Sequence, residues 1–298
     1  MIVTVTLNAA LDVTYQVGEV DWEGVNRVRS VHRRAGGKGV NVARVLVALG
    51  QEVIVTGLAG GLTGQAIKAD LEASGLPDAF VRVAGESRST LVVAPSHGGA
   101  ALFNEPGPEV SAAELACFLD TFDGLAKGAQ AVVVSGSLPR GVPTDVYAEI
   151  ARRAACPVIV DADGEALRQA VPGRPALIKP NAEELARAVP GASPEEAARH
   201  LMAEGAGAVV VSMGADGLLA VTPEGAFRAR MPYRVEGNPT GAGDALVAGL
   251  ALGLVGGEPW PERLRRAAAL GAAAVATPVA GEIDHEVFSE LQPKIVIE

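Results

Sequence analysis

Cysteine is scarce in this chain of 298 residues, and the few cysteines that occur are far apart. Cys117 and Cys156 form no C-x-x-C pair, so a disulfide framework and a redox motif are both disfavoured. The four histidines are scattered and lack the spacing of a zinc site. Two isolated thiols are typical of a reducing compartment, and we therefore expect a cytoplasmic protein without a zinc centre.

Long hydrophobic runs and an excess of positive charge are also missing. The longest nearly apolar run, Ala245–Gly257, has 13 residues, whereas a membrane-spanning helix needs roughly 20. The first residues lack a basic start, and Asp12 comes too early for a signal peptide, so we expect neither membrane insertion nor secretion. With 25 basic and 35 acidic residues the net charge is −10, which argues against a nucleic-acid partner. A small anionic ligand remains compatible with this charge, because a few local amides and cations can hold it.

The chain does contain a regular alternation of strand and helix patterns. Its hydrophobic share of 49% and charged share of 20% are those of a globular protein with a sizeable core. Most predicted strands are apolar on both faces, which is typical of a parallel sheet covered by helices on both sides. We predict one doubly wound α/β domain over residues 1–298, with strands at Val3–Leu7, Val53–Gly57, Ala131–Ser135, Val158–Asp161, Ala176–Lys179 and Ala208–Met213. The intervening helices are predicted at Val40–Leu49, Gln65–Ser74, Ala112–Ala126, Asp145–Ala154, Glu183–Val189 and Pro194–Glu204.

Two stretches, at about 12–34 and 82–104, interrupt this alternation. Val13, Tyr15 and Val17 alternate with polar residues, as do residues 91–94 and 101–103. Such strands are half exposed and belong to a separate small sheet. We expect them to form a β lid over one edge of the main sheet.

The strongest local signal is the segment Asn238–Asp244, which an apolar helical run follows directly. Gly241 and Gly243 permit a tight turn, and the start of the helix adds unpaired N–H groups and the positive end of its dipole. This combination predicts an anion hole for a phosphoryl group in transfer, with Asp244 placed to act as a general base. The structural alternative is an ordinary N-cap aspartate after a glycine turn, and the motif alone favours it.

A second glycine-rich segment, at 34–41, precedes a predicted helix. Gly36 and Gly37 allow the backbone to approach a ligand, while Lys38 and Asn41 supply a cation and an amide. A Walker phosphate loop is excluded, since neither its first glycine nor its final hydroxyl residue is present. A glycine-rich turn with a solvated lysine explains the segment equally well in isolation.

The segment 179–184 follows a buried strand and begins a helix. Ligands bind at the carboxyl ends of strands in open α/β sheets. Asn181 and Glu184 share one face of the first helical turn, where an amide and a carboxylate suit the water shell of Mg²⁺. A capping box formed by the same two residues is the structural alternative, and both roles can hold together.

Three weaker candidates remain. The segment Ser212–Gly217 either encloses a nucleotide or forms a hairpin turn. The Arg88 guanidinium suits a phosphate, and Asp12 can accept hydrogen bonds from sugar hydroxyls, although a solvated arginine and a turn aspartate are the plain alternatives. A further glycine-rich loop, at 57–64, does not match G-x-G-x-x-G, so a dinucleotide dehydrogenase is disfavoured.

Taken in order, these segments resemble the PfkB (ribokinase-like) family of carbohydrate kinases, most closely the branch of 1-phosphofructokinase and tagatose-6-phosphate kinase. The similarity extends from Val3 to about Leu291. The segments that carry it are Thr6-Leu-Asn8 with Asp12, Gly36-Gly-Lys-Gly-Val-Asn41, Asn104-Glu-Pro-Gly-Pro108, Ser135-Gly-Ser-Leu-Pro139, Lys179-Pro-Asn-x-x-Glu184 and Gly241-Ala-Gly-Asp244. The chain departs from the family where Ala9 replaces a usual proline and where Arg140 replaces another.

The resemblance implies phosphoryl transfer from ATP with Mg²⁺. Asp244 would be the catalytic base, and the amides of Gly241, Ala242 and Gly243 would hold the transferred phosphoryl group. Asn181 and Glu184 would order Mg²⁺ through water. The remaining nucleotide contacts would come from Lys179 near the phosphates, from the loop residues Ser212, Gly214 and Gly217, and from the helix 265–277 beside the adenine.

On the acceptor side, the resemblance implies hydroxyl contacts from Asp12, Gly36, Gly37 and Asn41. Lys38 and Arg88 would neutralise a phosphate already on the substrate, with Ser137 nearby. A free sugar needs no such cations, so a phosphosugar is favoured. The family also leads us to expect a homodimer that pairs through the lid strands.

Three functions are weighed. The first is an ATP-dependent kinase of a ketohexose phosphate, with fructose 1-phosphate as the leading substrate and tagatose 6-phosphate or fructose 6-phosphate as alternatives. The second is a sugar-phosphate sensor without catalysis, which loss of Asp244 or of the glycine turn would favour, but both are intact. The third is a kinase of a nucleoside or another small alcohol, which predicts a more apolar acceptor pocket.

Overall fold

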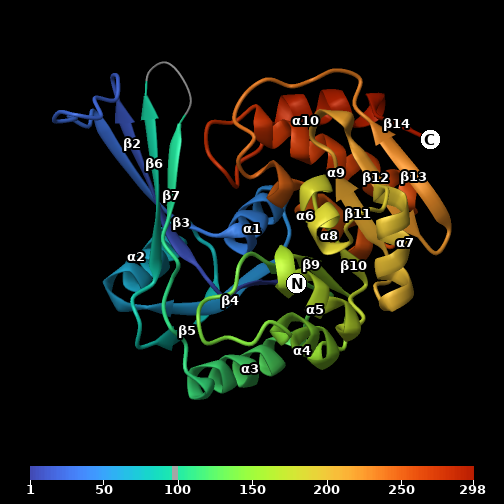
Figure 1. Ribbon diagram of the computed structural model, residues 1–298, viewed down its shortest axis with the longest axis horizontal. Helices are drawn as coiled ribbons and strands as arrows, with labels where there is room; N and C mark the ends of the chain where they lie inside the picture. The colour runs from blue at the N-terminus through green and yellow to red at the C-terminus, as the bar shows by residue number, and fades with distance from the viewer. Residues whose placement is uncertain (96–99) are drawn as a thin grey trace.

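The computed structural model describes residues 1–95 and 100–298, which contain two sheets of different size (Figure 1). Within these residues the larger sheet has ten strands in the order β14-β13-β12-β11-β10-β9-β8-β1-β4-β5. Their bounds are β1 Ile2–Thr6, β4 Val53–Gly60, β5 Asp78–Val83, β8 Ala131–Ser135, β9 Val158–Asp161, β10 Leu177–Ile178, β11 Val209–Ser212, β12 Leu218–Thr222, β13 Gly225–Arg230 and β14 Val296–Ile297. Pairing is parallel from β11 to β5 and antiparallel from β11 to β14. The mostly parallel sheet is confirmed, whereas the antiparallel edge is not predicted by the sequence pattern.

Helices cover both faces of this sheet, because alternate strand residues belong to different hydrophobic cores. Ile2 and Val133 face one core, and Val3 and Val132 face the other. The first face is covered by α1 Lys38–Ala48, α2 Gly61–Ala73, α8 Ala242–Val255, α9 Trp260–Val275 and α10 His285–Leu291. The second is covered by α3 Ala112–Ala126, α4 Val146–Arg153, α5 Gly164–Ala170, α6 Ala182–Ala188 and α7 Pro194–Glu204. Each fully buried aliphatic side chain contributes about 1.5–3 kcal/mol, so this double covering is the main source of stability.

Capping boxes begin three of these helices, α3, α6 and α7, and two of them are formed by serine and glutamate. The Ser111 hydroxyl accepts from the Glu114 amide at the start of α3, and Ser193 and Glu196 do the same at α7. A side-chain cap satisfies an N–H group that has no partner within the helix. Both helices therefore begin and end at the residues that the sequence predicts.

The smaller sheet is the lid. Its order is β3-β2-β6-β7, with β2 Ala10–Val17, β3 Ser30–Gly36, β6 Arg88–Pro95 and β7 Ala101–Asn104. The central pair, β2 and β6, is parallel, and the outer strands are antiparallel to it. In Figure 1 these strands project from the main body above α2. Of the predicted lid range 82–104, residues 82 and 83 instead end β5 of the main sheet, and residues 96–99 lie outside the described part of the chain.

No helix in the described residues is long and apolar enough to span a membrane. The parallel strands all end at one edge of the main sheet, where the loops with the predicted site residues begin. This edge positions the candidate site.

Candidate active site

Four neighbouring parallel strands, β8 to β11, deliver polar side chains to the same edge. Asp161 ends β9, Lys179 follows β10 and Ser212 ends β11, while Ser137 comes two residues after β8. The register holds them together, because Ser135 pairs with Asp161 and the Lys179 amide donates to the Val160 carbonyl at 2.9 Å. Ligand sites of open α/β sheets form at such an edge.

Asp244 lies in the first turn of α8, buried at the centre of this edge. Gly241 holds the N-cap position with φ +86°, and a Cβ there would come within 2.9 Å of Ala280. Asp244 makes no side-chain cap, so the plain N-cap interpretation does not account for it. Instead, its Oδ2 accepts a hydrogen bond of 2.8 Å from the Asn41 amide.

The protonation of Asp244 is shifted strongly by its surroundings. Burial raises the pKa of Asp244 to about 7, and the negative charge of Asp161 acts in the same direction. The hydrogen bond from Asn41 and the ammonium groups of Lys38 and Lys179 oppose this rise. A carboxyl group with a pKa near neutrality can take up a proton from a hydroxyl and release it again.

The three N–H groups predicted to form the anion hole differ in the hydrogen bonds that they already donate. In the described residues, the Ala242 N–H donates to the Pro239 carbonyl at 3.2 Å. Gly243 lies further into the first turn, where N–H groups have no partner within the helix. A Cβ on Gly243 would lie 3.6 Å from the Lys179 ammonium, so that cation lies beside the turn.

A compact group of charges surrounds Asp161. The ammonium groups of Lys38 and Lys179 each lie 3.2 Å from the same oxygen, Asp161 Oδ1. Lys38 is also 3.9 Å from Glu184 Oε1. Burial acts to lower the pKa of Lys38, but the carboxylates of Asp161, Glu184 and Asp244 outweigh it and raise that pKa above its ordinary value. Sequence analysis missed Asp161, although an acidic residue that ends a wholly apolar strand is a usable signal.

Asn181 and Glu184 form a reciprocal capping box at the start of α6. The Glu184 amide donates to Asn181 Oδ1 at 2.8 Å, and Glu184 Oε2 accepts from the Asn181 amide at 2.7 Å. The structural alternative is therefore confirmed. The described residues hold no group of three acidic, histidine or cysteine side chains that could bind a metal. Mg²⁺ is commonly held by one or two carboxylates together with substrate phosphates, so Asp161 and Glu184 fit a weakly held, water-bridged ion.

A cavity of about 700 Å³ opens beside the first turn of α8. Its lining includes the predicted nucleotide residues Asn181, Ser212, Gly214 and Gly217, together with Ala242 and Gly243. Ser212–Gly217 is also the turn between the antiparallel strands β11 and β12, so the hairpin interpretation is confirmed, and nucleotide binding by this segment stays a prediction. The Gly271 side of α9 lines the cavity as well, within the predicted helix 265–277.

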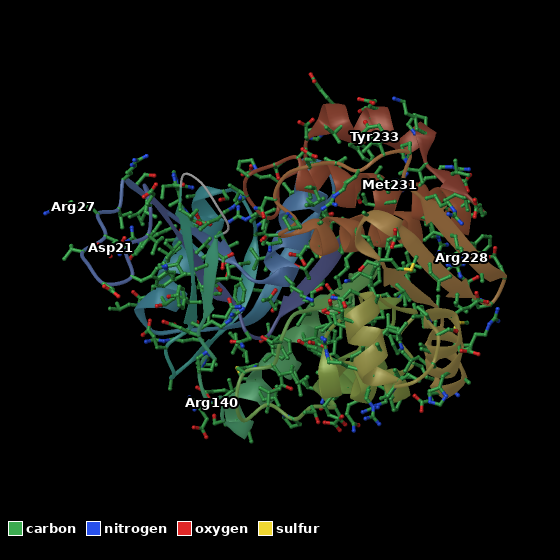
Figure 2. The ribbon with its side chains drawn as sticks, turned by 45° about the horizontal axis from the view of Figure 1, so that its top comes forward. Asp21, Arg27, Arg140, Arg228, Met231 and Tyr233 are labelled. Carbon is green, nitrogen blue, oxygen red and sulfur yellow. The ribbon has the colours of Figure 1, made fainter. Side chains whose placement is uncertain are left out.

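Sequence analysis missed one wall of this cavity. The segment after β13 also lines it, through Met231, Tyr233 and Val235. Figure 2 labels Met231 and Tyr233. Its residues have no regular periodicity or glycine pattern, so only the three-dimensional arrangement reveals them. Apolar side chains at this wall suit the flat face of a base.

The acceptor-side residues form a second group at the base of the lid. Arg88 Nε donates to the Asn8 carbonyl at 3.0 Å, and the Asn8 amide donates to Ser137 Oγ at 3.1 Å. Burial raises the pKa of Asp12, while the positive charge of Arg88 opposes it. Gly36 permits this packing, because a Cβ there would overlap the Asp12 carboxylate.

The predicted phosphate-binding cations thus have different partners. Lys38 contacts the carboxylates of Asp161 and Glu184, whereas Arg88 contacts Asn8 and faces Asp12. Lys38 nevertheless lies near Ser137, since a Cβ on the adjacent Gly136 would be 4.0 Å from Lys38 Cβ. Asn41, predicted to bind the acceptor, holds Asp244. Arg140 is exposed at the outer edge of the molecule (Figure 2).

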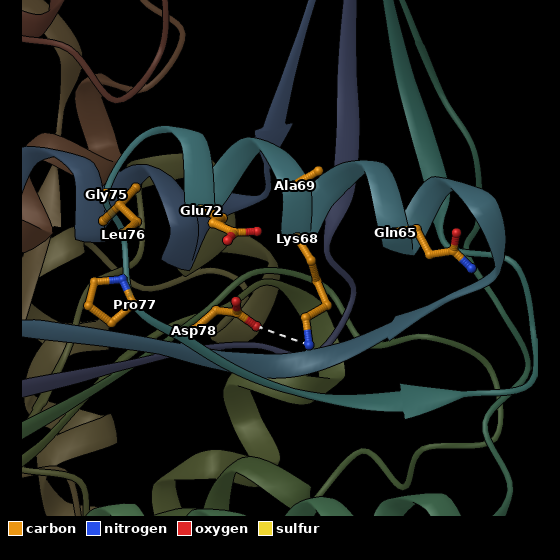
Figure 3. A pocket seen from close by; sticks show the side chains of 8 residues that line it. All are labelled: Gln65, Lys68, Ala69, Glu72, Gly75, Leu76, Pro77 and Asp78. Atoms are coloured by element: carbon orange, nitrogen blue, oxygen red, sulfur yellow. Dashed lines mark ion pairs between the residues drawn. The ribbon is translucent and has the colours of Figure 1, made fainter.

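A second cavity, of about 560 Å³, lies between α2 and the start of β5 (Figure 3). Lys68 and Asp78 form an ion pair of 3.5 Å at its wall. None of the residues that line it belongs to the predicted site. We therefore assign the chemistry to the cavity beside α8.

Comparison with known proteins agrees with this geometry. The model of the pfkB family of carbohydrate kinases matches residues 5–285. Phosphofructokinase-2 from Escherichia coli is 30% identical, with 98% of each chain covered and a TM-score of 0.92. A possible 1-phosphofructokinase from Thermotoga maritima is 26% identical, with 100% of this chain and 98% of that chain covered and a TM-score of 0.89.

Ribokinase from Thermotoga maritima shares the fold, at 19% identity and a TM-score of 0.80, with 98% of this chain and 99% of that chain covered. The ribokinase-like α/β fold with a small lid is thus confirmed. A match over most of the chain, together with phosphofructokinase neighbours, shows a phosphotransferase. The chain belongs to the PfkB family and is a phosphofructokinase-like sugar kinase.

Proposed function

We propose that this chain transfers the γ-phosphoryl group of ATP to a hydroxyl of a ketohexose phosphate, with fructose 1-phosphate as the substrate and fructose 1,6-bisphosphate as the product. One observation carries the proposal: Asp244, buried and held by Asn41, directly follows Ala242 and Gly243, which line the 700 Å³ cavity. A nucleotide on one side and an acceptor on the other meet at that carboxylate.

Each residue has a physical role in this scheme. Asp244 takes the proton of the acceptor hydroxyl as that oxygen attacks the γ-phosphorus and the bond to the β-phosphate oxygen breaks. The turn at Gly241–Gly243 and the dipole of α8 stabilise the charge that develops on the phosphoryl oxygens. Lys179, fixed on Asp161, adds a positive charge beside that turn.

The acceptor is held at the base of the lid. Asp12 accepts hydrogen bonds from sugar hydroxyls, and the Gly36–Gly37 backbone gives the ring close access. Arg88 and Lys38 bind the phosphate that the substrate already carries, with Ser137 as a neighbouring donor. Glu184 and Asp161 would hold Mg²⁺, through water, and the ion would neutralise the triphosphate.

A panel of acceptors tests the proposal. ADP release would be measured with Mg·ATP and fructose 1-phosphate, fructose 6-phosphate, tagatose 6-phosphate or free fructose. We expect turnover with fructose 1-phosphate, and a loss of at least about 10²-fold in kcat for Asp244→Asn, since a general base contributes 10²–10⁴-fold. Asp78→Asn, in the cavity under α2, is the matched control and should keep full activity. Binding of fructose 1-phosphate without turnover would instead indicate a sensor.

Fructose 6-phosphate is the second candidate substrate. Phosphofructokinase-2 from Escherichia coli, 30% identical to this chain, has been crystallised in complex with fructose-6-phosphate. A fructofuranose ring is nearly symmetric end to end, so one phosphate clamp can present either terminal hydroxyl to Asp244. A higher kcat/KM with fructose 6-phosphate than with fructose 1-phosphate would assign this alternative.

A further inference from the structure

The ammonium groups of Lys38 and Lys179 both contact the buried Asp161 carboxylate, but the two side chains differ in their exposure to solvent. Both lie 3.2 Å from Asp161 Oδ1. The Lys179 side chain is 4% exposed, whereas that of Lys38 is 38% exposed. Lys179 alone can keep the Asp161 charge compensated, so the departure of Lys38 would not leave an unpaired buried charge, which is costly.

The position of Lys38 also gives its ammonium group a second group of residues to approach. It is the first residue of α1, and its Cβ lies next to Gly136 at the turn that continues into Ser137. Ser137 and Arg88 are joined through Asn8. A lysine is a compact charge on a flexible four-carbon stem, so rotation about its side-chain bonds can redirect the ammonium from one group to the other.

The two ligands of the proposed reaction act on this lysine in opposite ways. A divalent cation near Asp161 and Glu184 repels an ammonium group that lies 3.2–3.9 Å from the same oxygens. A phosphate beside Arg88 attracts it. Each ligand therefore moves Lys38 in the direction that favours the other ligand.

We propose that Lys38 is an exchangeable counter-ion: it neutralises Asp161 and Glu184 in the free enzyme and moves to the acceptor's phosphate when the metal–nucleotide complex takes its place. This inference rests on the proposed function, because it requires an acceptor that carries a phosphate. This movement of Lys38 makes the binding of the two substrates synergistic without contact between them. Thermodynamic linkage requires the effect to be reciprocal.

Binding of Mn²⁺·ADP tests the mechanism without turnover, since ADP has no γ-phosphoryl group to transfer. Electron paramagnetic resonance of Mn²⁺ would give the dissociation constant with and without saturating fructose 1-phosphate. In the wild type we expect the phosphosugar to tighten Mn²⁺·ADP about fivefold to tenfold, within the usual range of coupling between sites. Free fructose should produce no such tightening, a comparison that needs no variant.

Two variants separate the roles of the cations. Lys38→Gln should bind Mn²⁺·ADP more tightly than the wild type when no sugar is present, and fructose 1-phosphate should no longer change that affinity. Arg88→Gln, the matched control, should weaken the phosphosugar but keep the coupling once the site is saturated. Coupling that persists in Lys38→Gln, or weaker Mn²⁺·ADP binding in that variant, would overturn the proposal. Failure of the proposed function is distinct, because the wild type would then turn over none of the phosphosugars.

Discussion

At the residue scale, activity depends on the charge of one buried carboxyl group. Asp244 has a pKa of about 7, and only its ionised form can accept a proton. We therefore expect kcat/KM for the acceptor to fall about tenfold per pH unit below pH 7 and to level off above it. A pH–rate profile between pH 5 and pH 9 measures this directly.

Replacement of Asn41 should shift the acidic limb of that profile. Its amide donates to Asp244 and so stabilises the charged carboxylate. Asn41→Ala removes this hydrogen bond, and the acidic limb should move upward by about one pH unit, since a bond to a charged group contributes 1.5–3 kcal/mol. A limb that stays in place or moves to lower pH would contradict the role given to Asn41.

Individual residues also show where sequence reasoning ends. The glycine turn and Asp244 could be recognised because their chemistry is local and contiguous. Asp161 could not be assigned in the same way, since its role comes from the Lys38 and Lys179 side chains, which are distant in sequence. Asn41 was predicted to hold sugar hydroxyls, and its contact with Asp244 was not predicted, because only the packing of α1 against α8 brings the two side chains together.

At the element scale, Arg34 joins the lid to the loop that packs against the catalytic turn. Arg34, on β3, donates to the Ala280 carbonyl at 3.3 Å and pairs with Glu282 at 3.0 Å. Ala280 packs against Gly241, and the neighbouring Gly281 packs against Asn41. The loop between α9 and α10 is therefore in contact with both the anion hole and the residue that holds the base.

Replacement of this arginine should slow the reaction. We expect Arg34→Met to lower kcat about threefold to tenfold, the effect of losing one or two partly exposed polar contacts, while KM for ATP stays the same. Arg33→Met, on the exposed neighbouring residue of β3, is the matched control. Equal effects of the two substitutions on steady-state kinetics would show that the contact with the loop is unimportant.

Strands were predicted correctly where both of their faces are buried, and they were missed at the antiparallel edge of the main sheet. Strands β8 and β9 are buried throughout, are apolar up to their last residue and match their predicted bounds. Strand β13, by contrast, alternates exposed and buried residues and includes two arginines, so nothing in its composition indicates a strand of the main sheet. Helices α5 and α10 have seven residues each, about two turns, which is too short for a helical period to be distinguished.

At the scale of the whole molecule, the lid exposes apolar side chains that a second copy of the chain would cover. Val31 on β3 is 39% exposed, and Leu102 and Phe103 on β7 are 53% and 52% exposed. Large apolar side chains that are exposed on the outer strands of a sheet suit an interaction surface. We propose that the lid sheets of two chains pair to form a homodimer.

A charge on this surface should separate the subunits. We expect the wild type to sediment with twice the chain mass and Leu102→Glu to sediment as a monomer at micromolar concentration. Leu62→Glu, on α2 and 78% exposed, is the control and should leave the dimer intact. A wild type that is monomeric, or a dimer that survives Leu102→Glu, would argue against pairing through the lid.

The interior position of β1 in the main sheet, between β8 and β4, has a consequence for how the chain folds. Ile2 pairs with Val53 on one side and with Ala131 on the other, so β1 cannot complete its ladder until the distant strand that begins at Ala131 is available. The lid has the same property, since β2 pairs with β6 from Ala10 and Arg88 onward. Closing such long loops costs entropy before the contacts repay it. Strands β1 and β2 therefore find all of their neighbours only when segments far away in the sequence are available to pair with them.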